Sequence, residues 1–409
     1  MTRSPTPGPA ARSAALIEQT ERVSARNYAP LPVVISRAEG VWAWDTEGRK
    51  YLDCLSAYSA LSHGHRHPKI LEALLEQTTR VTLTSRAFHN DRMGSFLAKL
   101  CDMCEMEMAL PMNTGVEAVE TAIKLVRKWG YRTKGVERDA AEIIVCRNNF
   151  HGRTTTIVGF SSEPQYREDF GPYSAGFQLI DFGDADQLAN AMTSNTVAFL
   201  VEPIQAEAGI IMPPDGYLTA VRQICSENNV LLVMDEIQTG LGRTGELFGY
   251  LHEAHAKPDV LVVGKALGGG VYPVSAVLSS RDIMGLIRPG DHGSTFGGNP
   301  LGAAVAQAAL EVIEDESLTE RSRELGEHLL GQLRGLRSNR VREIRGRGLL
   351  VGIELEPEAG PARDYSVRLL ELGVLSKDTH EQVIRLAPPL VIEKDELDWL
   401  VEQLRTALT

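Results

Sequence analysis

The sequence predicts an α/β protein with two parts: a large domain with a mainly parallel β-sheet covered by helices on both faces, and a smaller α+β domain. Between about residues 110 and 285, short and almost wholly apolar runs alternate with longer segments, which is typical of strands buried on both faces. Helical patterns dominate after residue 299. A length of 409 residues is enough for two or three domains.

Composition excludes several classes of protein. Hydrophobic residues make up 43% and charged residues 23%, which is typical of a globular chain. A net charge of −12 argues against a nucleic-acid or anionic-membrane surface. The most apolar stretch, residues 260–280, contains Lys265 and is interrupted by glycines and Pro273, so we expect no membrane span. The odd count of five cysteines favours free thiols in a cytoplasmic protein, with the mitochondrial matrix as the second choice.

The first elements predict an N-terminal segment at residues 14–56 that joins the smaller domain. Residues 1–13 are rich in proline and predict a disordered tail, and a helix is expected at 14–26. Residues 40–55 alternate apolar and polar around a glycine turn, as in a β-hairpin. Pro68 then begins a helix of the next domain.

The large domain is expected at residues 57–298 and the C-terminal small domain at 299–409. Helices are predicted at 116–130, where an apolar stripe ends at a glycine, and at 217–228. β-rich runs in the large domain lie at 142–146, 154–159, 197–201, 230–234 and 260–263. The small domain is expected to contain helices at 301–314, 317–336 and 395–408 and strands at 344–355 and 383–386.

Two residues in this plan are candidates for chemistry. Asp235 ends an apolar strand, at the sheet edge where parallel sheets bind ligands, although it could equally cap the following turn. Lys265 is the single charge in an apolar stretch, where burial favours the neutral amine that forms Schiff bases; a lysine with a packed stem and a solvated head gives the same pattern. Together the two match pyridoxal phosphate, which needs a Schiff-base lysine and an acid beside its pyridinium nitrogen.

The phosphate of such a cofactor needs amide donors, which helix N-termini supply. Thr114 and Glu117 have the spacing of a capping box at the start of a helix, and the run His292-Gly-Ser-Thr-Phe-Gly-Gly-Asn-Pro300 begins another. Phe150 could belong to the core or stack on a cofactor ring, and Arg153 could hold a substrate carboxylate.

Two other patterns point elsewhere. The run Gly240-Leu-Gly-Arg-Thr-Gly245 matches the dinucleotide pattern G-x-G-x-x-G, but four residues separate it from its strand and no capped helix follows. A dinucleotide oxidoreductase is therefore the rival of a different class. The alternating histidines at 63, 65 and 67 have no carboxylate or cysteine nearby to complete a metal site, so we expect a turn there and no metal.

Nine runs of the sequence together carry a resemblance to a known family. They are Asn27-Tyr-Ala-Pro-Leu-Pro32, Leu55-Ser-Ala-Tyr-Ser-Ala60, Leu110-Pro-Met-Asn-Thr-Gly-Val-Glu117, Phe150-His-Gly-Arg-Thr154, Val201-Glu-Pro-Ile-Gln205, Asp235-Glu-Ile-Gln-Thr-Gly240, Gly264-Lys-Ala-Leu-Gly268, His292-Gly-Ser-Thr295 and Arg385-Leu-Ala-Pro-Pro389. By these runs the chain resembles the ornithine aminotransferase branch of the class III, fold-type I pyridoxal-phosphate enzymes, from about residue 14 to the end. The Asp-Glu-Ile-Gln and Gly-Lys-Ala-Leu motifs are typical of class III, and the Tyr-Ala-Pro-Leu-Pro and Ser-Ala-Tyr-Ser-Ala runs are typical of the ornithine branch.

The resemblance implies a role for each residue around the cofactor ring. Lys265 would bind pyridoxal 5'-phosphate as a Schiff base and move the substrate proton, and Asp235 would pair with the pyridine nitrogen. Gln238 would bond the ring hydroxyl. Phe150 would stack on one face of the ring, and Ile237 would pack on the other.

The resemblance also implies a second subunit at the phosphate. The amides of Gly115 and Val116 would hold the phosphate, joined by Thr295 from the other subunit. A homodimer would then be the smallest active unit, and whether dimers assemble further stays open.

For the substrate, the resemblance implies a site with a switch. Tyr28 and Arg153 would grip the α-carboxylate of ornithine, and Tyr58 would shape the pocket. Glu207 would neutralise Arg385 while the terminal amine of ornithine reacts.

When 2-oxoglutarate or L-glutamate binds, Glu207 would swing away. Arg385 would then take the α-carboxylate, and Arg153 the γ-carboxylate. One departure is Ala206, where many relatives have glycine, so an added methyl group lies next to the switch.

The reaction so implied transfers the δ-amino group of L-ornithine to 2-oxoglutarate by a ping-pong route. The products are L-glutamate and glutamate 5-semialdehyde, which cyclises to pyrroline-5-carboxylate. The nearest alternative is another class III ω-aminotransferase that uses acetylornithine or 4-aminobutyrate. A class III aminomutase or racemase, which needs no keto-acid acceptor, is more distant.

Overall fold

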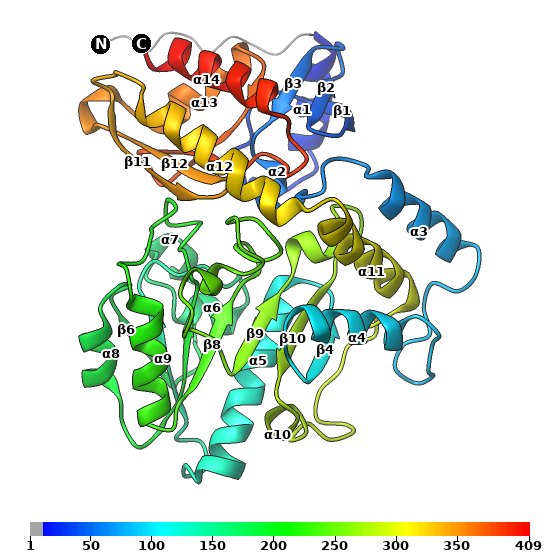
Figure 1. Cartoon of the computed structure of the whole chain (residues 1–409), viewed down its shortest axis with the longest axis vertical. Coiled ribbons are helices and arrows are strands. Elements are labelled where there is room, and N and C mark those ends of the chain that lie inside the picture. The colour runs from blue at the N-terminus through cyan, green and yellow to red at the C-terminus, as the bar shows by residue number, and fades with distance from the viewer. Residues whose placement is uncertain (1–10) are drawn as a thin grey trace.

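In the computed structural model, which describes residues 11–409, a seven-stranded sheet forms the centre of the larger domain (Figure 1). The strands pair in parallel except at β10, which runs antiparallel to both of its neighbours. The predicted α/β class with a mainly parallel sheet is therefore confirmed. In spatial order the strands are β4 (Met108–Met112), β10 (Ser275–Ser279), β9 (Val260–Val263), β8 (Leu231–Asp235), β7 (Thr196–Val201), β5 (Glu142–Cys146) and β6 (Phe177–Ile180).

The central strands β7, β8 and β9 are buried at every position, which explains why they are almost wholly apolar. Successive residues of a strand point to opposite faces. Leu231 accordingly joins the apolar cluster of helix α5 (Gly115–Trp129), and Leu232 joins the cluster that contains α9 (Tyr217–Glu227) and α11 (Pro300–Asp315). The remaining α-helices of this domain are α3 (Pro68–Thr78), α4 (Met93–Met103), α6 (Thr155–Gly159), α7 (Pro164–Arg167), α8 (Ala185–Ala191) and α10 (Arg281–Met284).

Two predicted strands differ from the structure. The run at 344–355 is not one strand but belongs to two antiparallel strands, Val341–Arg347 and Leu350–Leu355, joined by a turn. The other prediction is wrong in type. Residues 154–159, which the β-branched run Thr-Thr-Thr-Ile-Val suggested as a strand, form the short helix α6. The side chain of Thr154 accepts a hydrogen bond from the amide of Ile157, as a helix N-cap does. The local cap outweighs the β-propensity of the residues that follow it.

The two ends of the chain meet in the smaller domain. Strand β3 of the N-terminal segment pairs in parallel with β13 of the C-terminal segment, with Leu52 opposite Val374. A second sheet has the order β11-β12-β15-β14. The strands are β1 (Ile35–Glu39), β2 (Trp42–Asp45), β3 (Lys50–Asp53), β11 (Val341–Arg347), β12 (Leu350–Leu355), β13 (Val374–Leu375), β14 (Lys377–Thr379) and β15 (Val383–Leu386).

Helix α14 lies along the upper end of the smaller domain in Figure 1, whereas α2 lies where this domain meets the larger one. Helix α1 begins at Ala11, within the predicted tail, and Ser13 donates a hydrogen bond to Glu47. Residues 1–10 of that tail lie outside the described residues. The helices here are α1 (Ala11–Glu21), α2 (Ser56–Ser59), α12 (Leu318–Arg334), α13 (Ala362–Glu371) and α14 (Lys394–Leu408).

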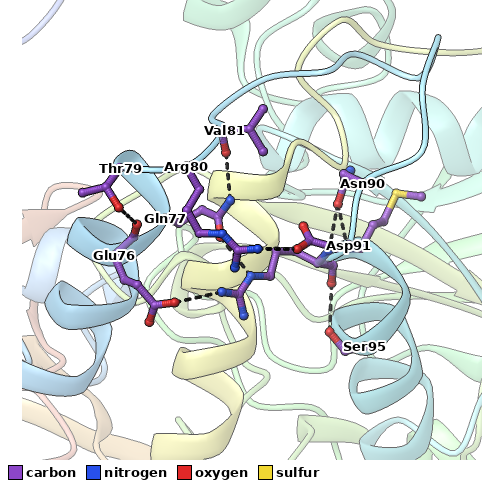
Figure 2. A network of polar contacts seen from close by, with 10 residues as sticks. Glu76, Gln77, Thr79, Arg80, Val81, Asn90, Asp91 and Ser95 are labelled. Carbon is purple, nitrogen blue, oxygen red and sulfur yellow. Dashed lines mark hydrogen bonds and ion pairs between the residues drawn. The ribbon is translucent and has the colours of Figure 1, made fainter.

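A network of polar contacts holds the connection between α3 and α4 (Figure 2). The buried amide of Gln77 donates to the carbonyl oxygen of Val81 and accepts from Arg92. Asn90 donates to the carbonyl oxygen of Gly298. The network therefore fixes this connection beside the segment that contains Thr295.

The glycine-rich run at 240–245 has a structural role that its dinucleotide-like pattern does not suggest. Its Arg243 is fully buried, and burial lowers the pKa of its guanidinium to about 9. The guanidinium donates to the carbonyl oxygens of Leu349 and Pro388, at 3.0 and 2.6 Å, and to the hydroxyl of Ser62 at 3.0 Å. Arg243 thus links the larger domain to two segments of the smaller one.

We expect Arg243→Met to lower the free energy of unfolding by about 3 kcal/mol, because two buried carbonyl groups and a hydroxyl lose their donor. The urea midpoint of unfolding measures this loss. Arg323→Met is the matched control, because Arg323 also bonds the 240–245 run, at Gly245, but is 48% exposed. An equal loss in the two variants would contradict the prediction.

Candidate active site

A cavity lies at the carboxyl ends of the parallel strands, where such sheets bind ligands. It is lined by residues that follow four neighbouring strands: β5, β7, β8 and β9. Of the eight residues predicted to bind a cofactor, seven line this cavity: Gly115, Val116, Phe150, Asp235, Ile237, Gln238 and Lys265. The eighth, Thr295, is exposed and does not line it.

Asp235 is fixed in the cavity by two contacts. His151 lies with its Nδ1 atom 2.7 Å from Oδ2 of Asp235, and the amide of Ile237 donates to Oδ1 at 3.0 Å. Burial lowers the pKa of His151, but the neighbouring Asp235 outweighs this effect and raises it overall. Asp235 therefore stabilises the charged form of the His151 imidazole away from water.

Lys265 is partly buried and begins the 3₁₀ turn Lys265–Gly268, which follows strand β9. Burial lowers the pKa of its amine, because the charged form loses its hydration. The backbone of Lys265 has a φ of 44°, in the left-handed region that residues with a β-carbon seldom adopt. The turn therefore delivers a nucleophilic amine into the cavity.

The N-terminus of α5 forms another wall of the cavity. Thr114 and Glu117 make the predicted capping box, in which each side chain accepts from the other's backbone amide. Among the described residues, the amides of Gly115 and Val116 have no hydrogen-bond acceptor. These two donors face a cavity and are available to an anion.

An ion pair between Glu207 and Arg385 lies beside the cavity. Nη1 of Arg385 lies 2.6 Å from Oε1 of Glu207, and the amide of Gln238 donates to the same oxygen at 3.1 Å. Arg385 is 1% exposed. Burial raises the pKa of Glu207, but Arg385 and Lys265 lower it by more, so this carboxylate stays ionised.

The other predicted substrate residues, Tyr28, Tyr58 and Arg153, are not among the residues that line the cavity. The ring of Tyr58 lies 4.7 Å from the guanidinium carbon of Arg385. The guanidinium of Arg153 stacks on Tyr166, 4.3 Å from the ring centre, and has no ion-pair partner among residues 11–409. Tyr28 is 68% exposed.

The sequence model of the family described as aminotransferase class-III matches residues 23–408 of this chain. The chain belongs to this family. It is 56% identical over 393 residues to an ornithine aminotransferase of Brevibacillus brevis, which covers 96% of this chain and 98% of that protein. It is 54% identical to an ornithine aminotransferase of Bordetella pertussis, which covers 98% of this chain and 97% of the relative.

Solved structures agree with this assignment of the class III aminotransferase. An ornithine aminotransferase of Toxoplasma gondii with partial occupancy of pyridoxal phosphate superposes with a TM-score of 0.95 at 43% identity, over 97% of this chain and 94% of that one. An acetylornithine aminotransferase of Elizabethkingia anophelis superposes with a TM-score of 0.87 at 44% identity, over 97% and 98% of the two chains.

Class III aminotransferases use pyridoxal 5'-phosphate, and the residues of this cavity fit it. The cavity contains a buried carboxylate for the pyridinium nitrogen, a buried amine for the aldehyde and free amides for the phosphate. The side-chain oxygen of Gln238 is buried without a partner and could accept from the ring hydroxyl. Phe150 and Ile237 line the cavity and supply an aromatic and an aliphatic surface for the ring.

The sequence analysis missed two buried polar residues of this aminotransferase. Glu202 lies directly after β7, much as Asp235 is the last residue of β8. The carboxylate of Glu202 accepts a hydrogen bond from the amide of Phe150 at 2.8 Å. The same strand-end pattern could have found Glu202. His151 is next to Phe150 in the sequence, but its pairing with Asp235 joins different strands and has no local signal.

The other patterns found by sequence have ordinary explanations in this aminotransferase. The histidines at 63, 65 and 67 contact Ala309, Asp53 and Glu316. No group of residues suited to hold a metal ion occurs in the part of the chain that the structure describes. Within residues 11–409, none of the helices combines the length and the hydropathy that a membrane crossing requires.

We expect the stability of the cofactor-free protein to depend on pH through Glu202. Burial raises the pKa of this carboxyl to about 7, above its usual 4.5, so the folded state holds a proton that the unfolded state has released. Its contribution to stability is complete below about pH 4.5 and is lost as the pH rises through 7. Glu202→Gln cannot ionise, so between pH 5 and 8 it should lose about 2 kcal/mol less than the wild type. Parallel stability curves in urea would contradict this.

Proposed function

We propose that this class III aminotransferase transfers the δ-amino group of L-ornithine to 2-oxoglutarate in a ping-pong reaction. The products are L-glutamate and glutamate 5-semialdehyde, which cyclises to pyrroline-5-carboxylate. The observation that carries the proposal is the ion pair between Glu207 and the buried Arg385, in electrostatic contact with Lys265. Relatives that are more than half identical over nearly their whole length and are named ornithine aminotransferase support it.

The ion pair explains how one site can accept two different substrates. With Glu207 at 2.6 Å, Arg385 is neutralised and offers no free charge to an α-carboxylate near Lys265. The terminal amine of ornithine can then reach Lys265, while the unpaired Arg153 and Tyr28 hold the distant carboxylate. When the five-carbon oxo acid binds, Glu207 moves away, and Arg385 and Arg153 each bind one carboxylate.

The chain's own residues handle charge and protons in this proposal. The bound cofactor supplies an electron-poor ring that acidifies the carbon next to the amine. Asp235, held by His151, keeps the ring nitrogen protonated. Burial lowers the pKa of the Lys265 amine and so favours its neutral form; this amine would hold the cofactor and, once released from it, would move the proton at the reacting carbon.

A homodimer is part of the same proposal. Thr295 is exposed and lies outside the cavity of its own chain, and its neighbour Phe296 is 49% exposed. Phe88, in the connection after α3, is 73% exposed. The bond from Asn90 to Gly298 holds these two segments together, so an apolar surface beside Thr295 supports docking of a second copy.

We propose a cytoplasmic location. The five cysteines are all free, which is typical of a reducing compartment, and the relatives are bacterial.

Mixing the yellow holoenzyme with L-ornithine alone should bleach the absorption band of the bound cofactor and release pyrroline-5-carboxylate, trapped with o-aminobenzaldehyde. Lys265→Ala, the matched control, should lose the covalent cofactor bond and all turnover, because no other buried amine lines the cavity among the described residues. Bleaching without trapped product would refute δ-transfer. No bleaching with L-ornithine, but bleaching with acetylornithine or 4-aminobutyrate, would favour the alternative ω-aminotransferase.

Thr295→Ala should weaken cofactor binding about tenfold, the loss expected for one hydrogen bond to a charged group. Equilibrium titration of the cofactor-free protein measures this change. In mixed dimers with Lys265→Ala chains, the site that keeps Lys265 receives Thr295 from its partner and should regain wild-type affinity. Unchanged affinity in Thr295→Ala, or no recovery in the mixed dimer, would argue against a shared site.

A further inference from the structure

Residues 206–210, the segment that contains Glu207, are held by hydrogen bonds from Arg345 of the smaller domain; we call these bonds the grip. Arg345 lies on β11, and its Nε donates to the carbonyl oxygens of Gly209 and Ile210, at 3.1 and 3.0 Å. Its Nη2 donates again to Gly209 at 2.7 Å. One guanidinium thus holds two successive carbonyl groups, two and three residues after Glu207.

The sheet places this grip in one row with Arg385. In the register of the small sheet, Arg345 lies opposite Gly352, and Gly352 lies opposite Arg385 on the next strand. A β-carbon on Gly352 would lie only 3.2 Å from the carbonyl oxygen of Gly209. The backbone at Gly209 therefore passes over Gly352, which lies between Arg345 and Arg385 in the sheet.

The segment itself is shaped for this close approach. Gly209 has a φ of 106°, which side chains rarely allow, and a β-carbon there would lie 3.4 Å from Nη2 of Arg345. Arg345 is 10% exposed, and its charge is balanced by Glu343 at 2.7 Å and by Glu354. The grip is therefore a nearly buried, fully bonded contact, unlike a solvated surface ion pair.

A second set of contacts holds the same backbone at Ala206 and Glu207. The methyl group of Ala206 is fully buried in a small apolar cluster with Ile204, Ile210, Leu350 and Ala387. The hydroxyl of Thr379 donates to the carbonyl oxygen of Glu207 itself. The backbone is thus fixed on both sides of Glu207, and its side chain is left to move.

From these contacts we propose that Arg345 is a positioning residue for the substrate switch. It fixes the backbone at 206–210, so that the Glu207 carboxylate meets Arg385 and Gln238, and only the Glu207 side chain rotates when the second substrate binds. The inference rests on the proposed function, and it assigns the buried methyl group of Ala206 to the same task.

Arg345→Lys tests the inference. Lysine keeps a positive charge beside Glu343 and Glu354, but its single nitrogen cannot hold both carbonyl groups in the geometry of a guanidinium. With Glu207 less well held, Arg385 is open to α-carboxylates. In single-turnover half-reactions of the holoenzyme, the ratio of kcat/KM for L-ornithine to kcat/KM for L-glutamate should fall about tenfold.

The ratio separates positioning from a general loss of structure, because a smaller folded fraction lowers both half-reactions alike. Arg342→Lys is the matched control: Arg342 lies on the same strand and bonds the same Glu354 at 3.1 Å, but it is 61% exposed and does not reach the segment. Its ratio should stay at the wild-type value. Should Arg345→Lys not fold, Ala206→Gly loosens the same backbone and should lower the ratio in the same direction.

An unchanged ratio in the folded Arg345→Lys holoenzyme, or an equal fall in Arg342→Lys, overturns the inference. Where Arg345→Lys does not fold, an unchanged ratio in Ala206→Gly overturns it. These results leave the proposed function intact, because the wild type still consumes L-ornithine. A wild type that reacts with L-glutamate but not with L-ornithine overturns the proposed function, and this inference with it.

Discussion

The central sheet is covered by apolar clusters on both faces, so charged side chains cannot lie on either face. The rest of the structure depends on this constraint. Alternate residues of β8 enter two different apolar clusters, so neither face can accommodate a charge. Ionisable groups instead gather where the strands end, and there they meet one another: Asp235 with His151, and Glu207 with Arg385. The chemistry of the site follows from that crowding, because burial favours the neutral form of each ionisable group unless an oppositely charged partner stabilises its charged form.

Two buried or nearly buried arginines connect the domains at their boundary. The guanidinium of Arg243 crosses it toward the smaller domain, and that of Arg345 crosses it toward the larger one. Both bind backbone carbonyl groups, which have no side-chain freedom to lose. Arg385, which belongs to the smaller domain, can therefore be placed against Glu207 of the larger one with the accuracy that a hydrogen bond of 2.6 Å requires.

Local signals in the sequence were enough to predict the residues whose role depends on one strand or one helix. Asp235 and Lys265 follow apolar runs, and Thr114 and Glu117 form the capping box that their spacing indicated. Residues whose role depends on distant segments were not predictable from residue patterns. His151 contacts Asp235, and Arg243 donates hydrogen bonds to Leu349 and Pro388. No local spacing in the sequence predicts contacts between residues so far apart. The switch pair came from resemblance to a family and not from the residues themselves. Helix α6 was missed because a single capping threonine outweighed a run with strong β-propensity.

The pairing of β3 with β13 also bears on how the chain reaches its native state. Contacts between these regions join residues more than 300 positions apart, such as the bond from Arg49 to Glu371 across 322 residues. During synthesis, the N-terminal strands emerge long before their partner exists, whereas the parallel sheet has all its strands once residue 279 has emerged. We therefore expect the larger domain to fold first and the smaller one to close last, with β3 waiting as an unpaired edge. Truncation before β13 would then leave β3 of the N-terminal segment without its pairing partner, so it would disturb both ends of the chain.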